Sequence, residues 1–115
     1  MSARIPGRNA ERWRLDPYGN PVVYALRGCQ GALCHEYDHI VPFSKGGKTV
    51  VENCQILQTA VNRYKSDKVN LPAWDLHKNS KKIHLKHEQM DLLEYSIYGD
   101  VGGTNKTKRS KSPKK

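Results

Sequence analysis

Residues 36–68 contain four side chains whose types and spacing suit a metal ion and a general base. Asp38 and His39 are adjacent; Asn53 follows His39 by fourteen positions, and Asn62 lies nine further on. A carboxylate and an amide carbonyl are hard oxygen ligands of the kind that suits Mg²⁺. A neutral imidazole can take a proton from water near physiological pH, because the unperturbed pKa of histidine is about 6.5. These residue types therefore predict a metal site beside a general base.

Each of these residues has an ordinary explanation when it is taken singly, such as a surface acid or a turn cap. Their order is far more specific: Asp-His-Ile-Val-Pro, then Ser-Lys-Gly-Gly, then Glu-Asn, then Asn-Arg-x-Lys-x-x-Lys. This arrangement resembles the HNH nuclease motif, in the variant that ends in Asn rather than His. The resemblance covers the middle third of the chain, and the whole chain is similar to small plant and algal proteins that consist of little beyond this domain.

The resemblance implies an endonuclease that cuts DNA, with RNA left open as a substrate. It implies that His39 is the general base, that Asn53 orients it, and that Asp38 and Asn62 hold Mg²⁺ or Mn²⁺. Five basic residues near the motif are candidates for binding the nucleic-acid backbone: Lys45, Lys48, Arg63, Lys65 and Lys68. Two other functions stay open, a catalytically weak nucleic-acid-binding module on the same fold and a zinc-stabilised interaction domain.

The resemblance also implies an α+β fold, in which a ββα-metal core follows an N-terminal hairpin. Residues 13–26 alternate around a turn-rich centre and predict that hairpin. We expect a strand at 37–41 that ends at Pro42, a returning strand at 54–57 and a helix at 58–67. On a strand, adjacent side chains point to opposite faces. Asp38 and His39 can therefore share one site only if the strand ends or bulges there.

A different interpretation of the same segment is one long helix. Thr49-x-x-Glu52 matches a helix capping box, and apolar residues from Val50 to Val61 could line one helical face. Propensity alone slightly favours this long helix. Strand followed by helix is preferred here because of the family resemblance.

The C-terminal half predicts one further amphipathic helix at 87–98, where Met90, Leu93 and Ile97 fall at helical spacing. The mixed stretch 73–85 is expected to be a basic connector. We therefore expect a flexible segment at 1–12, a nuclease domain at 13–101, and a disordered basic tail at 102–115.

Three cysteines raise the question of a structural zinc ion. Cys29, Cys34 and Cys54 could be ligands, but the second cysteine pair that many HNH proteins carry is absent. An odd number of cysteines in an apparently intracellular chain does not indicate a disulfide framework. Buried free thiols are therefore the preferred interpretation.

The composition of the chain narrows its partners and its location. Its 115 residues allow one small domain with a net charge of +9, which favours a phosphate-rich partner. No apolar run approaches the ~18 residues of a membrane helix, so we expect no membrane contact. We expect an intracellular protein because no secretory signal is evident, and the tail resembles a nuclear-import signal. The oligomeric state is not predicted.

Six of the 20 Lys and Arg residues lie in residues 104–115, which contain no acid, so this tail carries two-thirds of the net charge. Counterion release makes such a tail contribute salt-sensitive affinity for DNA. Deleting 104–115 should therefore weaken DNA binding and flatten its dependence on salt, as measured by titration at several salt concentrations. An unchanged salt slope would show that the tail does not contact DNA.

Overall fold

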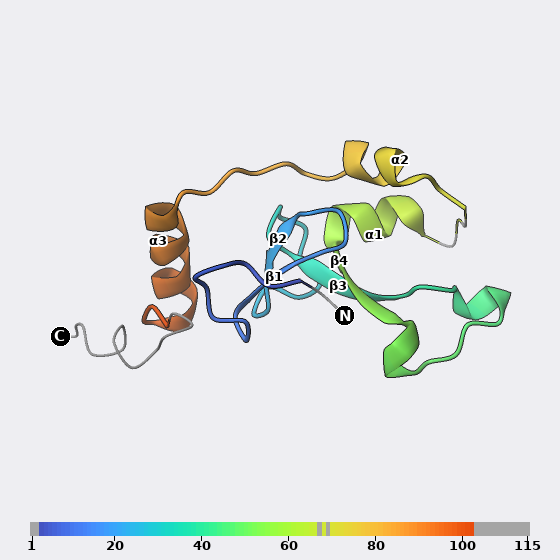
Figure 1. Cartoon of the computed structure of the whole chain (residues 1–115), viewed down its shortest axis with the longest axis horizontal. Helices are drawn as coiled ribbons and strands as arrows, with labels where there is room; N and C mark the ends of the chain where they lie inside the picture. Colours follow the sequence, from blue (N-terminus) through green and yellow to red (C-terminus); the bar gives the residue numbers. More distant parts are fainter. Residues whose placement is uncertain (1–2, 67, 69, 103–115) are drawn as a thin grey trace.

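The computed structural model describes residues 3–66, 68 and 70–102 of the chain. Two β-hairpins are followed by three α-helices, so the predicted mixed α+β class is confirmed (Figure 1). The predicted disordered tail lies outside the described residues from 103 onward. Within the described ranges, none of the helices has the length and apolar character needed to cross a membrane.

The first hairpin confirms the prediction for residues 13–26. Strand β1 (Trp13–Leu15) pairs antiparallel with β2 (Pro21–Val23). Between them Oδ1 of Asp16 accepts hydrogen bonds from the backbone N–H groups of Tyr18 and Asn20. This use of an aspartate to close a turn is a common reason for its presence there.

The second hairpin and the helix after it form the ββα unit. Strand β3 (His35–His39) pairs antiparallel with β4 (Cys54–Gln58), and α1 (Thr59–Lys65) follows β4 directly. The order of strand then helix is confirmed, although β3 lies two residues earlier than expected. The long-helix alternative is wrong because residues 54–58 pair with β3 instead.

Helix α2 (Ala73–Lys78) lies against α1 on the outer side of this unit (Figure 1). Leu57, Val61 and Leu76 are buried together between the two helices and β4. The sequence did not predict α2, which falls in the expected connector 73–85. Only one apolar side chain of this short helix is buried, so it carries no clear amphipathic pattern.

The side chain of Gln58 joins three parts of the chain at the junction of β4 and α1. It is fully buried; its Nε2 donates to the carbonyls of Ala32 and Lys81, and its Oε1 accepts from the Lys81 N–H at 2.8 Å. The backbone N–H of Gln58 donates to Oδ2 of Asp16 in the first hairpin. Buried polar groups with all partners satisfied in this way fix one arrangement of the surrounding segments.

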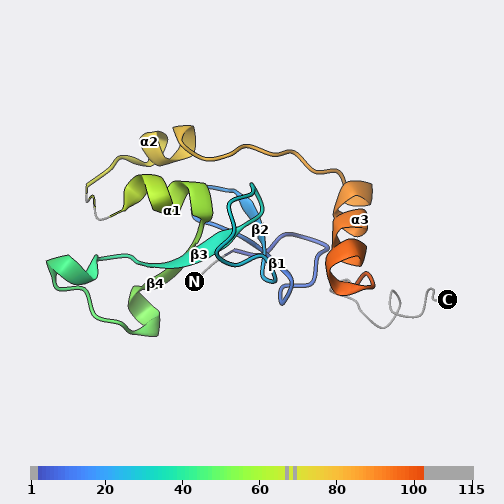
Figure 2. The same ribbon diagram turned by 180° about the vertical axis from the view of Figure 1, so that it is seen from behind.

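Helix α3 (His87–Tyr98) is confirmed at the predicted bounds and lies at one end of the molecule, beyond the extended segment 79–86 (Figures 1 and 2). Met90, Leu93 and Ile97 pack against the core around Trp13, as their spacing predicted. The helix ends at Gly99, whose φ of 87° lies in the left-handed region that glycine adopts readily.

A buried carboxylate attaches α3 to the N-terminal segment. Glu94 has no exposed side-chain surface and accepts hydrogen bonds from the guanidinium groups of Arg8 and Arg12, the indole of Trp13 and the N–H of Gly102. Residues 1–12 were expected to be flexible. In the structure Arg8 is only 3% exposed.

Replacing Glu94 with glutamine should lower the free energy of unfolding by about 3 kcal/mol, because it leaves the buried Arg8 and the partly buried Arg12 without their shared anion. Chemical denaturation of the variant and the parent measures this difference. Glu88→Gln, at an exposed position on the same helix, is the matched control and should change little. Equal stability of the two variants would show that the Glu94 network is not important for folding.

Candidate functional site

Side chains on β3 divide between two faces, as expected for a strand. Glu36 and Asp38 point toward α1, where their carboxylates contact Asn62, Arg63 and Lys65. Each face therefore carries a different part of the candidate site.

Asp38 is paired with a lysine in this structure. Its Oδ2 accepts a hydrogen bond from Nζ of Lys65 at 2.6 Å and another from Nε2 of Gln55 at 3.1 Å. Lys65 is only 8% exposed and also donates to the backbone carbonyl of His39. We expected Lys65 to contact a phosphate; its charge is instead balanced by the candidate metal ligand.

Asn62 contacts a second carboxylate. Its Nδ2 donates to Oε1 of Glu36 at 2.8 Å, while Arg63 donates to Oε2 at 3.0 Å. Burial raises the pKa of Glu36, but these two hydrogen bonds and the arginine charge outweigh it, so the pKa lies below its ordinary value. The two predicted metal ligands, Asp38 and Asn62, thus lie on facing elements and are held by different partners.

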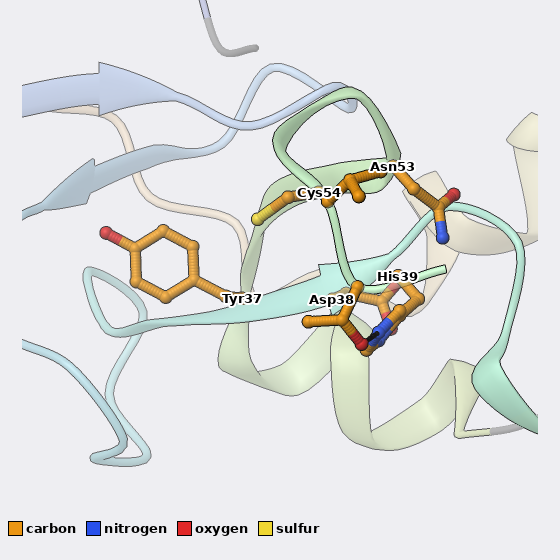
Figure 3. Close-up of a pocket in the computed structure, with 7 residues that line it drawn as sticks. Tyr37, Asp38, His39, Asn53 and Cys54 are labelled. Atoms are coloured by element: carbon orange, nitrogen blue, oxygen red, sulfur yellow. Dashed lines mark hydrogen bonds between the residues drawn. The ribbon is translucent and has the colours of Figure 1, made fainter. Parts of the chain in front are cut away.

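His39 is the last residue of β3 and points away from α1. Its Nε2 forms a hydrogen bond with the Thr49 hydroxyl at 2.9 Å. Asp38 and His39 both line a pocket of about 140 Å³, together with Asn53 (Figure 3). The strand ends at this point, but the Asp38 carboxylate stays on the α1 side, bound to Lys65 and Gln55.

Asn53 holds the ends of the loop between β3 and β4. Its Oδ1 accepts from the Val41 N–H at 2.8 Å, and its Nδ2 donates to the carbonyls of Val41 and Lys48 at 3.0 and 2.9 Å. Among the described residues no hydrogen bond joins Asn53 to His39, so any orientation of the imidazole by Asn53 acts through the loop backbone.

Gly47 is required where this loop closes. A Cβ at this position would lie 1.7 Å from the Val41 carbonyl oxygen and 2.9 Å from Nδ2 of Asn53. No side chain fits in that space. The Ser-Lys-Gly-Gly part of the motif therefore has a packing reason, since it lets the loop backbone approach Asn53.

The five basic residues proposed to bind nucleic acid lie in different environments. Lys45, Lys48 and Lys68 are exposed, whereas Arg63 pairs with Glu36 and is half-exposed. Lys45, Lys65 and Lys68 line one groove of about 350 Å³ that runs between the loop and α2. The exposed Lys45 and Lys68 make this groove basic, and a phosphate chain is a complementary ligand.

The cysteines contradict the expectation of free thiols. Cys29 and Cys34 form a disulfide, with 5.5 Å between their Cα atoms. Zinc is bound by thiolates, so a zinc site formed by Cys29, Cys34 and Cys54 is wrong for this structure. Cys54 is a free, half-buried thiol that pairs across the hairpin with His39.

The side chains of Asp38 and Asn62 carry oxygen atoms of the type that a divalent cation takes as ligands. No cluster of three or more His, Cys, Asp or Glu side chains suited to a metal occurs in the described part of the chain. Mg²⁺, however, is commonly bound by one or two carboxylates, with water and phosphate completing its shell. The Asp38 carboxylate is paired with the Lys65 ammonium at 2.6 Å, so a bound cation would have to replace this contact.

Three contacts of the site were not predicted from the sequence. Thr49 was assigned only to a helix cap, and neither Gln55 nor Glu36 was proposed for the site. Gln55 could have been found from the hairpin register, because it lies directly opposite Asp38. Glu36 could have been found from strand alternation, because it shares the face of Asp38.

Comparison with known proteins supports the motif. Residues 26–68 match the family model for HNH endonuclease. No curated protein and no solved structure gives a significant match to the chain. The matched segment begins before the disulfide and ends just after α1, so it contains every candidate catalytic and metal-binding residue.

Replacing Asn53 with alanine removes three hydrogen bonds that fix the loop ends. The free energy of unfolding should fall by about 1–3 kcal/mol, and the Val41 amide should exchange its hydrogen faster. Hydrogen exchange followed by NMR measures the second effect directly. Glu52→Ala, at the exposed neighbouring position, is the control. Equal protection of Val41 in both variants would contradict the role assigned to Asn53.

Proposed function

Residues 26–68 form an HNH endonuclease domain, and on that premise we propose that this chain hydrolyses DNA phosphodiester bonds with the help of a divalent cation. The observation that carries the proposal is the arrangement at the end of β3, where the Asp38 carboxylate faces α1 and the adjacent His39 lines a pocket on the opposite side. Phosphodiester hydrolysis needs an activated water and stabilisation of negative charge: His39 would supply the base, and Asp38 would help to hold the cation that stabilises the charge.

His39 is the proposed general base. Where Nε2 carries the proton and donates it to Thr49, the second ring nitrogen Nδ1 has the lone pair that can accept a proton from water. The hydrogen bond to Thr49 would thus select the reactive tautomer and limit rotation of the ring. A correctly held base matters because small misplacements of a reacting group cost large factors in rate.

Asp38 and Asn62 are the proposed ligands of the cation, which would be Mg²⁺ or Mn²⁺. When bound, such an ion stabilises negative charge on the phosphate and on the leaving oxygen. In this proposal Lys65 moves from Asp38 toward the phosphate, because the bound cation would neutralise the Asp38 carboxylate. Glu36 keeps Asn62 and Arg63 in place on α1.

The basic groove lined by Lys45, Lys65 and Lys68 is the proposed path of the nucleic-acid backbone. Lysine ammonium groups attract phosphate without reading base sequence. Arg63 and Lys48 lie outside this groove lining and would contribute to the wider positive field. DNA is the proposed substrate, and RNA is the alternative that the same phosphate contacts would allow.

One observation favours a second candidate, a nucleic-acid-binding module without turnover. The Asp38 carboxylate is bound closely by Lys65, and a cation must replace that contact before Asp38 can act as a ligand. A protein in which this exchange is unfavourable would bind DNA and leave it uncut. A zinc-stabilised interaction domain is not favoured, because two of its three thiols are joined in a disulfide.

Cleavage of supercoiled plasmid tests the proposed function. The parent protein should nick or linearise the plasmid with Mg²⁺ or Mn²⁺ and should be inactive with EDTA. His39→Ala should slow cleavage at least about 100-fold, as expected for loss of a general base. His84→Ala, at an exposed histidine on the segment 79–86, is the matched control and should cut normally.

Two outcomes would contradict the proposed mechanism. If His39→Ala cuts as fast as the parent, His39 is not the base. If neither protein cuts although both bind DNA, the binding module is the correct function.

A further inference from the structure

Apolar side chains are exposed on the same surface as the candidate active site. Nine large hydrophobic residues are exposed among the described residues, and six of them lie within 37–51. These six are Tyr37, Ile40, Val41, Phe43, Val50 and Val51. Clustered exposure of this kind marks a binding surface more often than chance, because burying such groups against a partner is favourable.

Phe43 is the most exposed member of this group, at 74%. It begins the 3-10 turn Phe43–Lys45, and its ring centroid lies 6.2 Å from that of His39. The loop that carries it extends away from the body of the molecule, at the end opposite α3 (Figures 1 and 2). An aromatic ring is thus presented to solvent directly beside the proposed general base.

The conformation of the loop holds Phe43 in this exposed position. The hydrogen bonds of Asn53 fix both ends of the loop, and Gly47 packs against the Val41 backbone. The ring of Phe43 lies outside both hydrophobic cores of the protein. Folding therefore does not require an aromatic side chain at this position.

The charge of the loop identifies the kind of partner. Residues 40–51 contain Lys45 and Lys48 and no acidic residue, and both lysines are exposed. A surface that combines lysines with an exposed aromatic ring is complementary to a polyanion with accessible flat, apolar faces. Nucleic acids with unpaired bases have this property, since their bases can stack on aromatic side chains while phosphates contact lysines.

We propose that the loop 40–51 binds unpaired bases next to the cleaved phosphate, with Phe43 stacking on a base. The inference rests on the proposed nuclease function and narrows its substrate to DNA with a single-stranded or unpaired segment. A continuous B-form duplex exposes phosphates and base edges, whereas base faces are covered by their neighbours. Such a duplex would leave the ring of Phe43 without a partner.

Binding measured in the His39→Ala background tests this inference without cleavage. A labelled DNA duplex is compared with the same duplex carrying a short unpaired bubble. The bubble should bind more tightly, and Phe43→Ala should weaken binding to it by at least about five-fold, the lower end of what loss of a stacked aromatic costs. Binding to the continuous duplex should not change.

Two further variants sharpen the test. Phe43→Trp keeps a stacking surface and should retain the preference for the bubble. Leu92→Ala removes a side chain of similar exposure, 68%, from α3 at the far end of the molecule and should change neither affinity. A 2-aminopurine base in the bubble should lose fluorescence on binding the parent and keep it with Phe43→Ala. Thermal unfolding of Phe43→Ala should match the parent, because the ring lies outside both cores.

Equal binding of the bubble by Phe43→Ala and its parent would overturn the inference. A uniform loss on both DNA substrates would also overturn it, because the loop would then bind continuous duplex. Plasmid cleavage by the protein with His39 intact reports separately on the proposed function. If no cleavage occurs while the effect of Phe43→Ala on the bubble persists, base stacking is supported and hydrolysis is rejected.

Discussion

The alternation of side chains along β3 is the constraint on which the candidate site depends. It directs Asp38 to the helix and His39 to the opposite face, although the two residues are adjacent. Both residues line a common pocket where the strand ends at His39 and the chain turns into the loop, although the Asp38 carboxylate stays on the α1 side. The position where β3 stops is therefore as important to the site as the identity of its residues, and Asn53 fixes the loop ends beyond that position.

Much of the architecture could be predicted because it follows from local signals. The turn around Asp16 predicted the first hairpin, and the spacing of Met90, Leu93 and Ile97 predicted α3. The second hairpin was different, since propensity slightly favoured a helix there and only the order of the motif residues indicated a strand. Long-range contacts such as those of Gln58 decide this segment, and they leave no periodic pattern in the sequence.

Spacing predicted which residues belong to the site but not the partners that each would have. Asn53 was expected beside His39 and instead binds loop backbone, because an amide can satisfy a peptide group equally well. Lys65 follows Asn62 by three positions on α1 and so shares its face, which is turned toward β3. That geometry gives Lys65 a carboxylate partner and removes it from solvent. The disulfide had no local signal beyond the pair of cysteines five residues apart.

The attachment of α3 has a consequence for synthesis of the protein. Glu94 is bonded to Arg8, 86 positions earlier in the chain, and Trp13 of the same network belongs to the first core. On the ribosome, the first hairpin therefore emerges long before the helix that covers it. Until translation reaches residue 94, the Trp13 core is incomplete and Arg8 lacks its carboxylate. The nascent chain must therefore avoid aggregation through this exposed surface, which is covered in the folded protein.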